Sequence, residues 1–307
     1  MNNFKNVIKN LEKDFGKIDY PINDSEAYLL YPDFNIVYNK MIIAKFQGLD
    51  CNPFPIEPKS FPIISKPIIN LMGMGLKAKK VVNKKQFSVE SFSGNFWCEF
   101  INGDHHSWDL IVRNGEIIYH TCFFGKKSKH FGLFKYWQQI KKELFPSIKL
   151  IVEKFLPGFT GSVNMETLDD KVIEVHLRMG DIDLVDKDII KLALYNIMKL
   201  DDETINSQLK IINSKKIKFI YLVPVWESMD KFCLETLEKK YKIIRKDIED
   251  ILINDDKIVS YYIDDPYHPN PENFKRWFLI LTYNLGHGIK VKNILEDRIS
   301  KETILIK

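Results

Sequence analysis

The stretch FTGSVNMETLDDKVIEVHLR, at positions 159–178, carries the strongest fold signal in this sequence. Residues 161–167 and 171–176 are each rich in strand-forming side chains, and the Leu-Asp-Asp segment between them is typical of a turn. The stretch therefore predicts a β-hairpin. Because side chains alternate between the two faces of a strand, the polar residues of each half fall on one face and the apolar residues on the other.

One face of this hairpin gathers charged side chains. Glu174, His176 and Arg178 share it, and Glu166 on the partner strand can face the same side. Two carboxylates and an imidazole offer ligands for Mg²⁺, which prefers oxygen. An arginine beside them can clamp a phosphate through two parallel hydrogen bonds. The alternative interpretation is an ion pair between Glu174 and Arg178 that faces solvent on an edge strand.

A buried strand and a glycine loop stand upstream of the hairpin. The apolar run at 61–67 is bounded by prolines, which predicts a buried strand, and Lys66 lies near its end. Residues 70–75 follow and contain Gly73 and Gly75. Backbone N–H groups in such a loop can wrap phosphate groups. A simple hairpin turn is the alternative for a stretch this short.

Periodicity and turn residues predict the remaining elements. Apolar residues at helical spacing predict a short helix within residues 1–30, and residues 36–47 predict a second helix that ends at Gly48. Residues 148–155 fit a helix or a strand, and residues 201–214 fit a linker or a surface helix. The other expected strands are 78–82, 95–101, 107–112, 116–119, 217–223 and 258–264, and the other expected helices are 133–145, 186–200, 229–254 and 271–285.

The order of these parts resembles the ATP-grasp superfamily over residues 36–185. Residues 38–40 resemble the start of a helix that begins with a lysine in that family. Residues 61–67 resemble the family's fPvivKP strand, whose lysine contacts the phosphates of ATP. Residues 159–166 and 173–178 resemble the family's paired motifs ftGxvNvE and iEvNpR. The resemblance implies an α+β fold of the ATP-grasp type, in which two lobes clasp ATP.

The resemblance also implies which residues meet the nucleotide. The two loop glycines fall in the mobile segment that covers the phosphates, and residues 96–101 resemble the hinge strand, whose backbone pairs with adenine. The ribose-binding glutamate of the family is missing; Asp104, His105 or His106 could replace it, and we expect His106 to do so. The expected ATP-binding residues are Lys40, Lys66, Gly73, Gly75, Trp97, Cys98, Glu99, Phe100 and His106.

The same resemblance assigns the metal site and the catalytic residues. Glu166 and Glu174 are expected to hold Mg²⁺ or Mn²⁺, with His176 as a further ligand. His176 stands where the family has asparagine, and an imidazole suits Mn²⁺ or a transition metal better than Mg²⁺. A hydrogen bond from His176 to a phosphate or to the substrate is the alternative. Arg178, which would meet the transferring phosphate, and Lys66 are the expected catalytic residues.

Three parts are expected along the chain: a reduced N-terminal region at 1–35, an ATP-grasp region at 36–200 and a C-terminal α/β segment at 215–307. Within the second part, the lid lobe covers about 60–95 and the metal-binding lobe about 100–200. The family normally carries a full α/β domain before the lysine-started helix. Either that lobe is reduced here, or the C-terminal segment takes its place.

Composition and charge narrow the class of protein. The chain has 307 residues, of which 45% are hydrophobic and 28% charged, as in an ordinary globular protein. No run approaches a membrane span, and the polar start lacks the apolar core of a secretory signal, so a cytoplasmic location is expected. The net charge of +4 suits an anionic small ligand, and nucleic acid is not the expected partner, although the aromatic and basic run at 123–131 could bind it. The four cysteines form no CxxC pair, which argues against a zinc site or a disulfide framework.

The activity implied by the resemblance is ATP-dependent ligation. A substrate carboxylate would attack the γ-phosphate of ATP to give an acylphosphate and ADP, and an amine would then displace phosphate to form an amide or peptide bond. The expected partners are therefore ATP, a small-molecule or peptide carboxylate and an amine acceptor. Three alternatives remain open: a phosphotransferase of the same fold with a hydroxyl acceptor, a non-catalytic nucleotide-binding protein and a nucleic-acid-binding protein.

Overall fold

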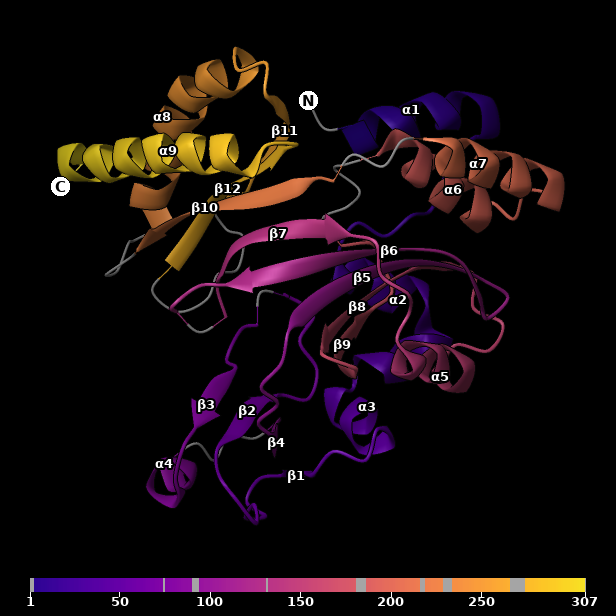
Figure 1. Ribbon diagram of the computed structural model, residues 1–307, viewed down its shortest axis with the longest axis vertical. Helices are drawn as coiled ribbons and strands as arrows, with labels where there is room; N and C mark the ends of the chain where they lie inside the picture. Colours follow the sequence, from indigo (N-terminus) through magenta and orange to yellow (C-terminus); the bar gives the residue numbers. More distant parts are fainter. Residues whose placement is uncertain are drawn as a thin grey trace.

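The strands of the chain form two separate sheets (Figure 1). The computed structural model describes residues 3–73, 75–89, 94–130, 132–180, 186–215, 219–228, 234–265 and 274–306. The smaller sheet has the strand order β1-β4-β2-β3, and the larger has the order β11-β12-β10-β7-β6-β5-β8-β9. Neighbouring strands are antiparallel in both sheets. Antiparallel sheets combined with helices confirm the predicted α+β class.

The smaller sheet forms a lobe at the bottom of Figure 1. Strand β2 of this sheet pairs with β3 on one side and with β4 on the other, which confirms the strand expected at 61–67. Ile63 on this strand is buried against Val81, Phe87 and Trp97, so the lobe has an apolar core of its own. The elements of the lobe are β1 (Cys51–Pro53), β2 (Ile63–Pro67), β3 (Lys79–Val81), helix α4 (Lys84–Val89) and β4 (Asn95–Glu99).

The larger sheet contains two tight hairpins, one of which is the hairpin predicted for residues 159–178. Asn114 and Gly115 adopt φ angles of 50° and 83° between the first two strands, the left-handed pair that a type I′ hairpin turn requires. Asp169, at φ 48°, turns the chain in the hairpin of residues 159–178. The strands of this sheet are β5 (His105–Arg113), β6 (Glu116–Lys127), β7 (Phe134–Ile140), β8 (Gly161–Leu168), β9 (Lys171–His176), β10 (Tyr221–Ser228), β11 (Ile258–Ile263) and β12 (Phe274–Thr282).

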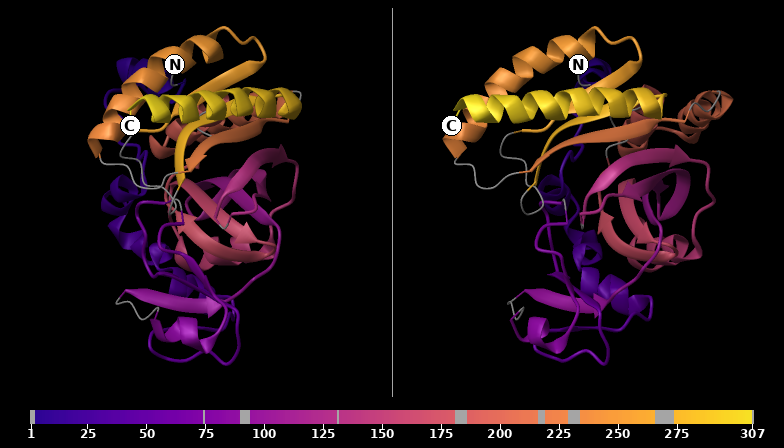
Figure 2. Two further views of the ribbon diagram at one scale, coloured as in Figure 1. Left: turned by 90° about the vertical axis from the view of Figure 1, so that its left-hand side faces the viewer. Right: turned by 60° about the vertical axis from the view of Figure 1, so that its left-hand side comes forward.

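Helices cover one face of the larger sheet at both ends of the strand order, and the two C-terminal helices lie across the C-terminal strands in Figure 2. Trp108 of β5 and Met165 of β8 pack against α5 (Pro146–Phe155), so residues 148–155 are helical. At the other end of this face, Val223 and Ile280 pack against α8 (Leu234–Ile253) and α9 (Leu285–Ile306). The C-terminal strands therefore extend the same sheet, because β10 pairs with β7.

The opposite face is covered at one end only. There α6 (Lys187–Ile197) and α7 (Asp202–Ser214) pack on Ile111, Phe123 and Leu222. The amphipathic helix expected near the N-terminus is α1 (Asn3–Phe15), which packs its apolar side on α6. Among the described residues, the rest of this face borders a cavity. None of the helices in the described ranges combines the length and apolar character that crossing a lipid bilayer requires.

The prediction of a single helix at 36–47 is wrong, because the helix is interrupted at Asn39. A 3₁₀ helix, η1 (Pro32–Tyr38), follows α2 (Asp24–Leu30) and ends there, and α3 (Lys40–Phe46) begins at the next residue. The Asn39 side chain accepts a hydrogen bond from the Ile42 N–H at 3.0 Å and so caps the new helix. Lys40 is therefore the first residue of α3.

Two other predicted helices are strands. Within the helix expected at 133–145, Phe134–Ile140 form β7, which pairs with β6 and β10. The helix expected at 271–285 is replaced by β12, while residues 271–273 lie outside the described residues. The run from Trp277 to Leu281 is apolar throughout because β12 lies between β10 and β11 with both faces buried. A short apolar run of this kind cannot be told from a buried helix by periodicity alone.

Candidate active site

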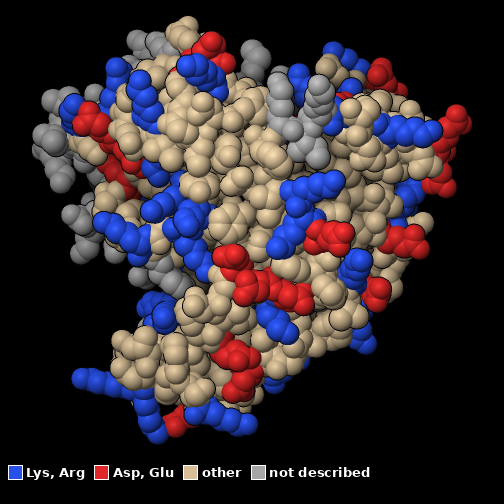
Figure 3. Space-filling model, viewed as in Figure 1, with Lys and Arg blue, Asp and Glu red and all other residues tan. Residues whose placement is uncertain are grey.

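A cavity of about 1810 Å³ lies over the open face of the larger sheet. The register of the strands puts its lining side chains on one face, from Glu174 on β9 to Tyr262 on β11. The smaller lobe borders the cavity at the β9 end through β2 and the loop that follows it. In the space-filling view, Lys and Arg side chains stand on both sides of the notch between the smaller lobe and the rest of the molecule (Figure 3).

Most of the residues expected from sequence meet around this cavity. The exceptions are Trp97 and His106, which are absent from its lining. Asp24, which the sequence did not single out, belongs to the lining as well, and so does His105, one of the three residues considered for the ribose. The expected residues that line it are Lys40, Lys66, Gly73, Gly75, Cys98, Glu99, Phe100, Glu166, Glu174, His176 and Arg178.

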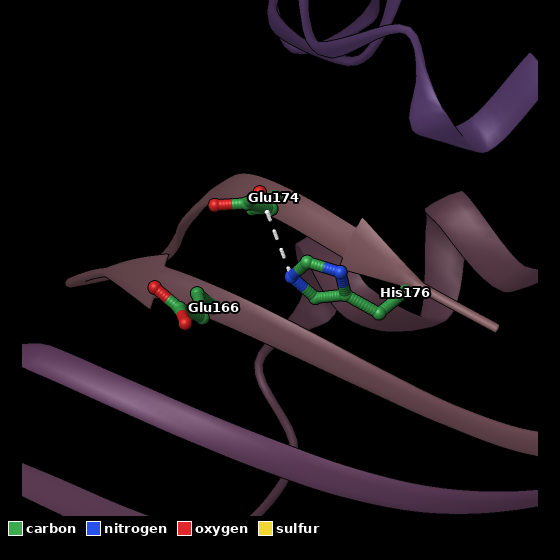
Figure 4. Close-up of side chains that lie close together, drawn as sticks. All are labelled: Glu166, Glu174 and His176. Atoms are coloured by element: carbon green, nitrogen blue, oxygen red, sulfur yellow. Dashed lines mark ion pairs between the residues drawn. The ribbon is translucent and has the colours of Figure 1, made fainter. Parts of the chain in front are cut away.

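Glu166, Glu174 and His176 form a compact group of possible metal ligands on β8 and β9 (Figure 4). One ligand atom from each lies within 4.8 Å of the other two. Glu166 and Glu174 are direct partners across the two strands. Like charges placed opposite each other in this way repel, so the sheet gains nothing from the pair alone. Two carboxylates and one imidazole nitrogen are a donor set that fits a divalent cation.

Positive groups balance these carboxylates. The Lys40 Nζ atom lies 2.6 Å from Glu174 Oε1, and His105 Nε2 lies 2.9 Å from Glu166 Oε2. Burial on its own would raise the pKa of Glu166, but the hydrogen bond and charge of His105, with His176 and Lys40, lower that pKa to about 2. Glu166 is therefore ionised at neutral pH and available to a cation.

Asp24 at the start of α2 holds two residues of the site. Its carboxylate accepts from His176 Nδ1 at 2.9 Å and from Arg178 Nη2 at 2.7 Å. With the proton on Nδ1, the Nε2 lone pair of His176 points toward Glu174 Oε1, 3.6 Å away. A carboxylate behind a histidine in this way fixes the tautomer that can bind a metal. Asp24 is only 2% exposed.

Lys66 reaches from the smaller lobe to the larger sheet. Its Nζ atom donates to the carbonyl oxygen of Ile173 on β9 at 3.1 Å. Burial lowers the pKa of Lys66, and the nearby positive charge of Lys40 lowers it further. Two lysine ammonium groups held close together repel each other, and an anion bound between them relieves that repulsion. This pair therefore supports the expected phosphate contacts.

The end of β4 borders the cavity at the join between the lobes. Cys98, Glu99 and Phe100 line it there, whereas the Trp97 side chain points away and donates from Nε1 to the carbonyl of Ile56 at 2.5 Å. Alternation along β4 places the side chains of Trp97 and Cys98 on opposite faces. The backbone pairing of this segment with adenine stays a prediction.

The two glycines of the loop after β2 also line the cavity. Gly73 and Gly75 have φ angles of 67° and 59°, in the left-handed region that side chains other than glycine rarely adopt. A Cβ atom at either position would meet nothing within 4 Å. The backbone conformation, and not a lack of space, therefore calls for glycine in this loop.

The structure corrects the assignment of His106. Its ring lies among Trp108, Phe124 and Phe145, on the face of β5 that packs against α5. Its neighbour His105 points to the cavity, in line with Ser107 and Asp109. Strand alternation allows only one of the two histidines to face the site. Which of them does so depends on the register of β5 against β8, and therefore on where Glu166 lies across the strand pair.

Solved structures share this arrangement, although no family model and no curated protein matches the sequence. L-amino acid ligase from Bacillus licheniformis superposes with a TM-score of 0.59 at 13% identity, over 95% of this chain and 82% of that one. For carboxyaminoimidazole ribonucleotide synthase from Aspergillus clavatus, complexed with ATP, the values are 0.54, 8%, 87% and 74%. For N5-carboxyaminoimidazole synthetase from Staphylococcus aureus they are 0.52, 10%, 90% and 78%. These proteins are ATP-grasp enzymes. The chain has the ATP-grasp fold.

The ATP-grasp fold accounts for the two sheets. The smaller lobe and the larger sheet correspond to the two lobes that the resemblance over residues 36–185 implied. The described residues before Lys40 form helices and no strand, whereas β10, β11 and β12 extend the larger sheet. At identities of 8–13%, the likeness establishes the fold and leaves the reaction to the site.

Proposed function

We propose that this protein is an ATP-dependent ligase that joins a carboxylate to an amine and releases ADP and phosphate. The observation that carries the proposal is the meeting of Lys40, Lys66, Glu166, Glu174 and Arg178 around one cavity between two lobes. Phosphoryl transfer is catalysed mainly by positioning and by neutralising charge on the phosphates, and these five side chains have the charges to do both.

Each residue has a role that follows from its place. Lys40 and Lys66 would bind the phosphates of ATP. Glu166, Glu174 and Nε2 of His176 would hold Mg²⁺ or Mn²⁺, which would supply positive charge to neutralise the phosphates. Arg178 extends from the same strand face and would bind the transferring phosphate group or the substrate carboxylate.

The reaction would proceed in two steps. A carboxylate oxygen attacks the γ-phosphorus of ATP, the bond to the β-phosphate oxygen breaks, and ADP leaves. The amine nitrogen then attacks the acyl carbon, phosphate leaves, and the nitrogen loses a proton. An acylphosphate hydrolyses in water, so the site has to be covered; the loop with Gly73 and Gly75 borders the cavity where it could do so.

Similar enzymes support this reaction class. The solved structures that share the fold include an L-amino acid ligase, and an N5-carboxyaminoimidazole synthase from Aspergillus clavatus was solved with ADP and 5-aminoimidazole ribonucleotide. We take from them the class of chemistry, a ligation driven by ATP. The carboxylate and the amine of this chain need not be theirs.

A thermal-shift titration with ATP tests the nucleotide part of the proposal. ATP with Mg²⁺ or Mn²⁺ is expected to raise the melting temperature as its concentration rises, because ligand binds the native state. EDTA should reduce the shift. Release of ADP that requires both a carboxylate and an amine would then identify a ligase, whereas release with a hydroxyl compound alone would identify a phosphotransferase. Folded protein that no nucleotide stabilises would contradict the proposal.

Replacing Lys66 with alanine is expected to weaken ATP binding by about 10- to 100-fold, because a charge-assisted hydrogen bond contributes about 1.5–3 kcal/mol. Isothermal titration with ATP and metal measures the change. Lys59→Ala is the matched control, since Lys59 is exposed on the same lobe and does not line the cavity. Equal ATP affinity in the Lys66 variant and the control would refute the phosphate role.

A further inference from the structure

Part of the cavity away from the metal ligands has a wall of aromatic rings. Phe134 and Trp137 on β7 lie with their ring centroids 4.2 Å apart. The ring of His105 meets both of them edge to face, at 4.9 Å and 5.4 Å. All three rings line the cavity, and both β7 residues are only half-buried, so they offer apolar surface to a ligand.

The neighbouring strands are shaped to hold this wall. Gly125 on β6 is paired with Trp137, and a Cβ atom there would lie 2.7 Å from the Trp137 ring and 2.8 Å from the Phe134 ring. Only glycine leaves room for the two rings at this point of β6. On the other side, Trp226 of β10 donates from Nε1 to the carbonyl of Phe134 at 3.3 Å, which places its indole beside the wall.

The wall begins next to the reacting end of the cavity. His105 contacts Phe134 and Trp137 with its ring and Glu166 with its Nε2 atom, 2.9 Å from Oε2. One imidazole therefore separates the proposed metal ligand from the aromatic surface. A substrate whose carboxylate meets Arg178, on the metal-ligand side of His105, would extend its other end along the sheet toward β7 and β10.

We propose that this aromatic wall binds the side chain of the substrate, and that the substrate carries an aromatic or large aliphatic group. This inference rests on the proposed function, because it assigns substrate selection to one part of the cavity of the proposed ligase. Recognition by such a surface depends on the apolar area that the ligand buries. Small or charged side chains would leave the rings in water and lose that contribution.

The test uses amino acids as probes, because each carries a carboxylate and an amine and they differ in the side chain. ADP release is measured with ATP and Mn²⁺ or Mg²⁺, and with L-phenylalanine, L-leucine, glycine, L-aspartate or L-lysine. We expect kcat/KM for L-phenylalanine and L-leucine to exceed the values for the other three by at least about tenfold. Equal values across the panel would overturn the proposal.

Substitution of the wall makes the test specific. Trp137→Ala is expected to raise KM for L-phenylalanine by at least about tenfold with little change in kcat. Trp137→Phe should restore most of the loss, and Gly125→Ala should reproduce it by displacing both rings. Tyr136→Leu is the matched control: Tyr136 is the next residue on β7 but faces the other side of the sheet, where it packs with Tyr221. In all these variants KM for ATP should stay unchanged; a change confined to ATP would assign the wall to the nucleotide and refute the proposal.

Direct binding separates this inference from the ligase proposal. L-phenylalanine is titrated into the whole protein by calorimetry, without turnover. Saturable binding that Trp137→Ala weakens, with no ADP released by any probe, would uphold the wall and reject the ligase. ADP release that shows no side-chain preference and is unaffected by Trp137→Ala would uphold the ligase and reject the wall. If no probe binds or reacts, the wall is rejected as a site for amino-acid side chains.

Discussion

Glu174→Gln is expected to lower ATP turnover by at least about 100-fold, since a metal held at the phosphates contributes several kcal/mol to the barrier. Glu174 is central to the site because it is the cross-strand partner of Glu166. Its Oε1 atom also lies 2.6 Å from Lys40 Nζ and 3.6 Å from His176 Nε2. Glutamine keeps the shape of the side chain and removes its charge. ADP release at saturating ATP and metal measures the effect.

The control for this variant is Glu116→Gln at the exposed start of β6. It makes the same chemical change on a neighbouring part of the sheet and should leave turnover at the wild-type level. The Glu174 variant also leaves Lys40 without its buried partner, so circular dichroism is needed to show that it is folded. Folded Glu174→Gln protein with wild-type turnover would remove the metal assignment.

Asp24→Asn is expected to reduce both stability and turnover. Asp24 is buried and accepts hydrogen bonds from His176 and Arg178, so its loss leaves two cationic or polar partners without a buried carboxylate. Breaking a buried ion pair from one side costs about 3–5 kcal/mol. The melting temperature should fall by roughly 5–10 °C, whereas Asp33→Asn, at an exposed aspartate of the same region, should change neither property.

The effect of Asp24 should depend on pH. Burial would raise the pKa of its carboxyl, but the nearby His176 and Arg178 lower it well below its ordinary value. A carboxyl whose pKa is lowered by folding contributes stability that is present above its unfolded pKa, about 3.9, and is lost as the pH falls further. Thermal melts at pH 7 and pH 3 should therefore show the difference between wild type and Asp24→Asn narrowing at the lower pH. A constant difference would mean that the charge of Asp24 does not contribute.

Much of the site was predictable because its chemistry follows strand alternation. Glu166, Glu174, His176 and Arg178 sit within one hairpin, where a period of two residues decides which side chains share a face. Lys66 was also predictable from local sequence, because prolines mark both ends of its strand. Local sequence was sufficient wherever the residues of the site were also neighbours along the chain or across a tight turn.

What escaped prediction depends on distant contacts. Asp24 stands in an ordinary helix start, and only the fold brings it to His176. The alternating residues of β7 and the continuous apolar run of β12 fit a helix or a strand until their neighbours in the sheet are known. The choice between His105 and His106 needed the register of β5 against β8, which no residue near them specifies.

The link between Asp24 and His176 also bears on how the protein is made. The two residues are 152 positions apart in the chain, and Lys66 is 107 positions from its partner Ile173. Contacts between such distant segments form late, because the chain must first give up the entropy of closing a long loop. On the ribosome, Asp24 waits for its partners until more than half of the polypeptide has emerged. We therefore expect the nascent chain to form its candidate active site in the same step that brings α2 to β9.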